Sequence, residues 1–216
     1  MEESEACNSL VKPMMLTSGA RTAPQRQQTL RATLEWSYGL LTAKEQCLLV
    51  CLSVFSGSWT FAAAEEVTGC SLDLMAQLVN KSLVIADQQN GQTRYRLLET
   101  VRQFAAEQAV TDEQALRQVQ RRHSRYYLHL LGTQEERLQS PQQRVALDIL
   151  RADFANMSTA WHWAVEQHEF DLLAPAIHAL FLFCDITSRF RPGIALFAQA
   201  AIALRAERAG RSAAQS

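Results

Sequence analysis

Apolar residues recur at spacings of three and four over the first third of the chain, a pattern that predicts short amphipathic helices. The first predicted helix is Thr29–Leu41, and its apolar face carries Leu30, Leu34, Tyr38 and Leu41. Thr42 and Glu45 have the spacing of a capping box, in which a Thr and a Glu three residues later satisfy each other's backbone N–H groups. A second helix is therefore expected to begin after Thr42, with an inner face formed by Leu48, Leu49, Leu52 and Phe55.

Two further helices are expected before residue 83. Thr60 is a plausible N-cap for a short helix, Phe61–Val67, because Thr and Ser side chains accept hydrogen bonds from the free N–H groups of a first turn. Ser71 has the same role before a helix with apolar positions at Leu74, Met75, Leu78 and Val79. The chain thus begins with three or four helices.

The apolar period then changes to two, which is typical of β-strands. The segments Leu83–Ala86 and Thr93–Leu97 flank Asn90-Gly91, and an Asn-Gly pair between two such runs indicates a β-hairpin. Glu99 opens another helix after the hairpin. Helices followed by one hairpin are the order of a winged helix, so residues 28–110 are predicted to form a winged-helix domain.

The second half of the chain is predicted to be helical throughout. A capping pattern at Thr111–Gln114 and the segment Ser140–Gln143, with Ser as N-cap and Pro in the first turn, start two long helices. Two more are expected at Phe170–Cys184 and Ile194–Arg208, separated by Pro192-Gly193. The spacing of these helices fits tetratricopeptide-like hairpins. The predicted fold is therefore mainly α: a tail or linker at 1–27, the winged helix, an α-helical repeat-like domain at 112–208, and a disordered tail at 209–216.

Composition narrows the function classes. The chain has 48% hydrophobic residues, 20% charged residues and a net charge of −1, which describes a globular protein without a general attraction to nucleic acid or to an anionic membrane. The first residues are acidic, unlike a signal peptide, and no apolar run reaches 18 residues. An odd number of cysteines, five, without a signal peptide suggests a reducing cytoplasm, so we expect a cytoplasmic location and no membrane partner.

The motifs of catalysis are missing. The sequence contains no G-x-x-x-x-G-K-[ST], G-x-S-x-G or H-E-x-x-H, and its five histidines fall on separate helical positions. Cys47 and Cys51 share a helical face, which is compatible with metal ligands, but without a nearby histidine they are better interpreted as small packed residues. We expect no enzyme activity, no metal and no cofactor.

Two segments, TLRATLEWSYGLL (Thr29–Leu41) and YRLLETVRQFA (Tyr95–Ala105), resemble a region of bacterial STAND-type, NB-ARC-like signalling ATPases and of AfsR- and LuxR-like transcriptional regulators. In that family this region is a winged helix that senses the nucleotide state, followed by helical repeats. The resemblance implies a P-loop ATPase core as partner, in cis or in trans, because this chain has no such core. It also implies a clamp interface at Trp36, Tyr38, Leu98, Glu99 and Arg102. Leu97-Leu98-Glu99 stands where related switches have Met-His-Asp, which removes the histidine that would reach a nucleotide.

Nucleic-acid binding is the alternative. The helix before the hairpin, Ser71–Ser82, is the expected recognition helix, and Gln77 and Asn80 can read bases, but Lys81 is its one cation. Further candidate contacts to nucleic acid or to an acidic partner are Arg94 and Arg96 in the wing and, at spacings of four on a later helix, Arg117, Arg121 and Arg125.

Because phosphate-neutralising charge is scarce in the expected recognition helix, the sequence favours a non-catalytic regulatory and protein-interaction role over DNA binding. The resemblance implies that this role belongs to a STAND-type signalling ATPase. A stand-alone winged-helix DNA-binding transcriptional regulator is the alternative function. A folded remnant of a disrupted gene is a third interpretation.

Overall fold

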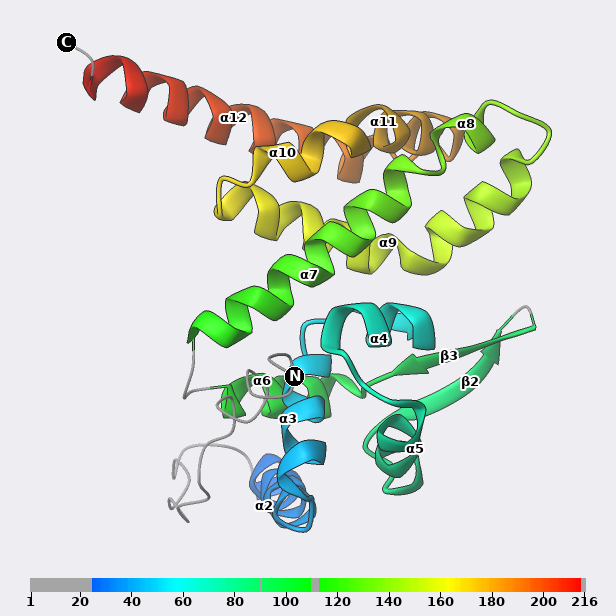
Figure 1. The fold of residues 1–216 in the computed structure, drawn as a ribbon, viewed down its shortest axis with the longest axis vertical. Helices are drawn as coiled ribbons and strands as arrows, with labels where there is room; N and C mark the ends of the chain where they lie inside the picture. The colour runs from blue at the N-terminus through cyan, green and yellow to red at the C-terminus, as the bar shows by residue number, and fades with distance from the viewer. Residues whose placement is uncertain (1–24, 90, 110–112, 215–216) are drawn as a thin grey trace. The chain divides into compact units, whose positions relative to one another are not determined.

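The computed structural model describes residues 25–89, 91–109 and 113–214, and the chain divides into two compact units, Met1–Val119 and Gln120–Ser216 (Figure 1). The elements of the first unit are α2 (Gln25–Gly39), α3 (Ala43–Leu52), β1 (Ser58–Thr60), α4 (Phe61–Thr68), α5 (Leu72–Asn80), β2 (Ile85–Gln89), β3 (Gln92–Arg96) and α6 (Glu99–Gln108). The division between the units falls inside α7 (Glu113–Gly132). The predicted tail at 1–27 lies almost entirely outside the described residues.

The caps predicted for the first unit are confirmed. Thr42 and Glu45 form a complete capping box at the start of α3. The Thr60 side chain accepts a hydrogen bond from the N–H of Ala63, and the Ser71 side chain accepts one from the N–H of Leu74. Because these side chains satisfy otherwise free N–H groups, α3, α4 and α5 all begin where the sequence predicts.

The sheet of the first unit has three strands in the order β1-β3-β2, and both pairs are antiparallel. The predicted hairpin is present as β2 and β3, and it projects from the helices in Figure 1. Gly91 has a φ of +78°, which a tight turn requires and glycine adopts without strain. The short strand β1 was not predicted, because its three residues carry too little periodicity to be recognised.

The core of the first unit lies between α3, α4, α5, α6 and the sheet. The predicted inner face of α3 is buried, and the Phe55 ring stacks on Trp59 in β1 with ring centroids 4.8 Å apart. Tyr38 from α2 meets Phe104 from α6 edge to face at 5.5 Å. The resulting helix order and wing are those of a winged helix.

All the elements described in the second unit are helices, joined by short turns. After α7 it contains α8 (Glu135–Leu138), α9 (Gln143–Glu166), α10 (Phe170–Leu173), the 3-10 helix η1 (Ala174–Ala176), α11 (Ile177–Ile186) and α12 (Phe190–Ala214). Trp161 on α9 is buried and donates from Nε1 to the carbonyl oxygen of Leu196 on α12 at 3.0 Å. This contact ties the two longest helices of the unit together.

Several helix boundaries in the second unit differ from the prediction. Phe170–Cys184 is not one helix, because Pro175 interrupts it and the chain passes through η1. Pro192-Gly193 does not separate helices: α12 begins at Phe190, so Pro192 lies in the first turn, where its missing N–H costs nothing. Ser140 does not cap α9, whose N-cap is Gln142.

The C-terminal half of α12 extends beyond α9 and α10 (Figure 1) and continues to Ala214, past residue 208, where the sequence predicted its end. Its alanine-rich composition favours the helix. Helices as long as α9 and α12, with 24 and 25 residues, do not fit in pairs within a repeat of about 34 residues. The structure therefore gives no support to tetratricopeptide-like repeats.

Candidate nucleic-acid interface

The helix-turn-helix of the first unit consists of α4, a three-residue turn and α5. Gly69 ends α4 with a φ of +71°, and its N–H donates to the carbonyl oxygen of Glu65 at 2.7 Å. Ser71 then caps α5. The left-handed glycine and the serine cap thus set the tight connection that leads into the predicted recognition helix.

The helix α5 presents two distinct faces. Met75 and Leu78 are fully buried and anchor it to the core. The exposed residues of α5 are Leu72, Asp73, Ala76, Gln77 and Asn80. Its outer face therefore offers two amide side chains, two apolar side chains and one carboxylate, and no cation.

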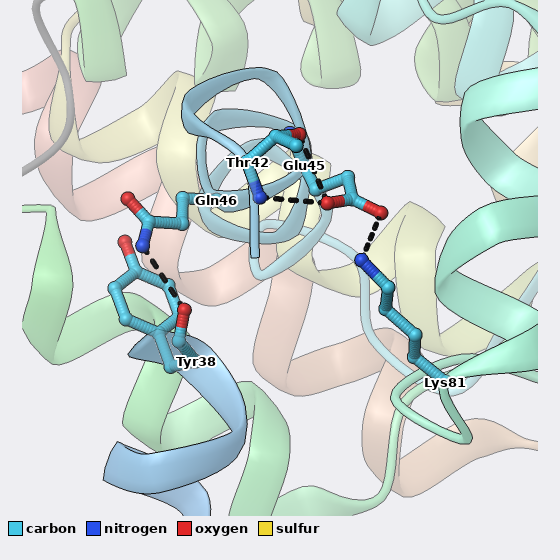
Figure 2. A network of polar contacts seen from close by, with 5 residues as sticks. All are labelled: Tyr38, Thr42, Glu45, Gln46 and Lys81. Atoms are coloured by element: carbon cyan, nitrogen blue, oxygen red, sulfur yellow. Dashed lines mark hydrogen bonds and ion pairs between the residues drawn. The ribbon is translucent and has the colours of Figure 1, made fainter. Parts of the chain in front are cut away.

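Lys81 caps the C-terminal end of α5 and forms an ion pair inside the domain (Figure 2). Its Nζ lies 2.5 Å from Oε1 of Glu45, whose side chain is 1% exposed, whereas the Lys81 side chain is 40% exposed. The other carboxylate oxygen of Glu45 accepts hydrogen bonds from the backbone N–H of Thr42 at 2.7 Å and from its hydroxyl at 2.9 Å. Burial acts to raise the pKa of Glu45, but the hydrogen bonds from Lys81 and Thr42 outweigh it and leave the pKa below its usual value.

The two wing arginines also bond within the domain. Arg94 is 5% exposed and donates from Nε to the Ser58 hydroxyl at 2.9 Å and from Nη2 to the Ser58 carbonyl oxygen at 2.8 Å. Arg96 pairs with Asp87 across the hairpin, Nε to Oδ2 at 3.0 Å, and both side chains are partly exposed. Arg94 therefore ties β3 to β1, whereas Arg96 remains at the surface.

The arginine series on α7 is exposed at Arg117, Arg121 and Arg125, as a spacing of four on one helix predicts. Arg121 is joined to Glu169 of the second unit through Nε at 2.9 Å and through Nη2 at 3.0 Å. An arginine held by both carboxylate oxygens is fixed in place. Part of this series thus contributes to the packing of the helical unit.

The residues predicted for a clamp interface have different environments. Trp36 is 68% exposed on α2, and Leu98 is 47% exposed at the start of α6. Tyr38 is buried instead, and desolvation raises the pKa of its hydroxyl to about 12. Its ring packs within the domain, so Tyr38 is not a surface contact.

Glu99 and Arg102 are brought together at the first turn of α6. Two nitrogens of Arg102 donate to the two carboxylate oxygens of Glu99 at 2.7 and 2.8 Å. The hydrogen bonds from Arg102 lower the pKa of Glu99 to about 2. The pair is exposed at a helix N-terminus, where a carboxylate is favoured.

The sequence did not predict the ion pair of Glu45 with Lys81 or the bonds of Arg94 to Ser58. In each case the partners are 36 residues apart. The capping box identified Glu45 as a local cap only. No group of three His, Cys, Asp or Glu side chains suited to a metal occurs in the described part of the chain, and no described helix is long and apolar enough to cross a membrane.

Comparison with known proteins agrees with this geometry. Residues 41–109 match the family model described as a winged helix-turn-helix domain. Over 154 residues the chain is 42% identical to a protein of Mycobacterium bovis and to one of Mycobacterium tuberculosis, each named "Putative HTH-type transcriptional regulator"; the match covers 65% of this chain and 17% of the relative. An uncharacterised protein of Mycobacterium tuberculosis is 36% identical over 101 residues, which is 43% of this chain and 26% of that protein. No solved structure matches.

The chain therefore spans about a sixth of the length of the regulators it matches. Its winged-helix fold and its homology to proteins named as HTH-type transcriptional regulators are established by these matches and by the structure. The chain contains a winged helix-turn-helix domain, followed by a helical region.

Proposed function

We propose that this chain is the winged-helix portion of a transcriptional regulator and contacts DNA through α5 and the β2–β3 wing. The observation that carries the proposal is the helix-turn-helix of α4 and α5, with the amide side chains of Gln77 and Asn80 on the exposed face of α5. The family match and the names of the relatives support it.

The exposed face of α5 has the chemistry of base recognition rather than of phosphate binding. In a helix-turn-helix the second helix enters the major groove. There Gln77 and Asn80 can each form two hydrogen bonds with adenine, and Ala76 can contact the methyl group of thymine. Each good amide–adenine pair contributes about 1–3 kcal/mol of discrimination against the wrong base.

Phosphate contacts are expected to be few. Arg94 is buried and held by Ser58, so its release would leave polar groups of the sheet without partners. Arg96 is different, because an exposed ion pair such as that with Asp87 contributes only about 0–1 kcal/mol, and Arg96 can turn to a phosphate at little cost. The proposal therefore predicts weak sequence-independent binding with a shallow salt dependence.

The test is a fluorescence anisotropy titration of the full chain with a random duplex and with duplexes enriched by repeated selection. Gln77→Ala is expected to weaken binding to the selected duplex by about 1–3 kcal/mol and to leave binding to the random duplex unchanged. Gln139→Ala, an exposed change in the second unit, is the matched control. No binding to any duplex at low salt, or an equal effect of both substitutions, would refute the proposal.

A second candidate function is docking on a protein partner, namely the P-loop ATPase core of a STAND-type regulator. The exposed apolar side chains of Trp36 and Leu98, together with the internal bonds of Lys81 and Arg94, favour it. The resemblance of Thr29–Leu41 and Tyr95–Ala105 to that family also supports it. The matched family description and the relatives' names mention no ATPase.

The docking function has its own test. An immunoblot of the source cell with an antibody against this region should then show a band far above the 24.3 kDa of this chain. In that longer protein Trp36→Ala should accelerate ADP release, because it removes apolar contact area from the closed state. A band near 24.3 kDa would exclude an ATPase core in the same polypeptide, and an unchanged release rate in the longer protein would exclude the clamp.

A further inference from the structure

The connection between α2 and α3 bonds to the C-terminal end of the recognition helix through one carboxylate. One carboxylate oxygen of Glu45 accepts a hydrogen bond from the Lys81 ammonium, and the other accepts one from the backbone N–H of Thr42 (Figure 2). Gln46, the next residue on α3, donates from Nε2 to the carbonyl oxygen of Tyr38 at 3.0 Å, and this bond ties the end of α2 to α3. Glu45 thus joins the start of α3 to the end of α5, and the neighbouring Gln46 joins α3 to the end of α2.

Backbone hydrogen bonds define the C-terminal end of α5, where Lys81 is the C-cap residue. The N–H of Leu83 donates to the carbonyl oxygen of Leu78 at 3.0 Å, and the N–H of Ser82 donates to that of Val79 at 2.9 Å. Ser82 has a φ of +59°. These bonds form a Schellman motif, which fixes the direction in which the chain leaves α5. From this end of the helix the Lys81 side chain reaches Glu45 on α3.

We propose that Glu45 is a positioning residue that holds the Lys81 ammonium at the end of α5, fixes the recognition helix against α3 and withholds this charge from DNA phosphates. A buried carboxylate that loses its cation keeps its desolvation penalty, so the pair is not exchanged freely for a phosphate. The exposed pair of Arg96 and Asp87 has no such penalty.

This role rests on the proposed DNA contact and refines its specificity. Phosphate contacts supply sequence-independent affinity, whereas base contacts discriminate between sequences. By keeping Lys81, the cation at the C-cap of α5, away from the phosphates, Glu45 leaves Gln77 and Asn80 as the main source of affinity on that helix. The expected result is weak binding to random DNA and a high ratio of specific to non-specific affinity.

Glu45→Gln is the informative variant because glutamine at this position preserves the capping box and removes only the charge. Lys81→Met removes the cation and keeps the apolar stem. Lys44→Met is the matched control, since Lys44 is exposed and is the neighbour of Glu45 in sequence.

The first measurement is a double-mutant cycle on urea unfolding with Glu45→Gln, Lys81→Met and the double variant. The two single changes are expected to be coupled by about tenfold in the unfolding constant.

Acylation of the lysines, followed by peptide mass spectrometry, gives a readout that needs no DNA. Lys81 should react more slowly than Lys44 in the wild type and at a similar rate in Glu45→Gln. Additive effects of the two substitutions on the unfolding constant, or equal acylation rates of Lys81 and Lys44 in the wild type, would overturn the inference.

The second measurement is the salt dependence of binding to a random duplex. Glu45→Gln should steepen the slope of log K against log salt by about 0.9, one phosphate contact, so its affinity falls about 3.5-fold more between 50 and 200 mM salt. Lys81→Met should leave the wild-type slope unchanged. A slope reduced by about 0.9 in Lys81→Met would show that Lys81 already contacts a phosphate, and would overturn the inference. If the wild type binds no duplex, the proposed function fails, and the cycle and the lysine rates still decide the role of Glu45.

Discussion

The buried histidine of α7, His123, is expected to make the helical unit sensitive to mild acid. Its side chain is 2% exposed, its Nε2 lies 3.4 Å from Oδ1 of Asn156, and its ring centroid lies 4.8 Å from that of Tyr127. Burial lowers the pKa of His123 from 6.5 to about 4, although the hydrogen bond with Asn156 acts in the opposite direction. The imidazole is therefore neutral in the folded protein near neutral pH.

The sign of the effect follows from proton binding. Between pH 6.5 and about 4 the unfolded chain binds a proton at His123 that the folded protein does not bind, so the free energy of unfolding falls as the pH falls. The full difference in pKa corresponds to about 3 kcal/mol, of which about 2 kcal/mol is lost on going from pH 7.5 to pH 5.

The assay is urea unfolding of the full chain at pH 7.5 and pH 5, followed by circular dichroism. His123→Gln is the matched variant, because glutamine keeps a polar group near Nε2 and does not titrate. It should reduce the pH dependence by about 2 kcal/mol, whatever its effect on stability at pH 7.5. An equal pH dependence in wild type and variant, or an NMR titration midpoint of His123 near 6.5, would refute the reasoning.

Two glycine substitutions test backbone geometry in the two units. Gly69→Ala should lower the free energy of unfolding by about 1 kcal/mol through its φ of +71° alone, because an added Cβ meets no atom within 4 Å; unchanged urea stability would contradict the left-handed cap. Gly132→Ala should cost about 1–3 kcal/mol for a different reason, since its Cβ would lie 2.7 Å from the carbonyl oxygen of Pro175. A loss below about 0.5 kcal/mol in the same urea assay would mean that α7 and η1 do not approach this closely.

Local signals in the sequence were sufficient for most of the winged helix. Each cap depends on residues three positions apart, and the turn of the hairpin depends on Asn90-Gly91, so a short window of sequence contains the whole cause. The strand β1 could not be predicted in this way, because it forms only by pairing with β3, with Trp59 opposite Tyr95.

The helical unit and the candidate interface depend more on tertiary packing. Gly193 was expected to break a helix, but it lies in α12, where an added Cβ would be 2.9 Å from Sγ of Cys184, so the glycine allows two helices to approach. The sequence also identified Lys81 and Arg94 as cations without showing that Glu45 and Ser58 hold them. Such pairs join distant segments, and no local pattern records them.

An NMR titration of the backbone amides with a selected duplex tests the central claim most directly, because it shows which surface of the domain meets DNA. The account predicts signal shifts concentrated on α5 between Leu72 and Asn80 and on the wing around Arg96. Shifts concentrated at Trp36 and Leu98, or no shifts at low salt, would contradict recognition of DNA by this winged helix.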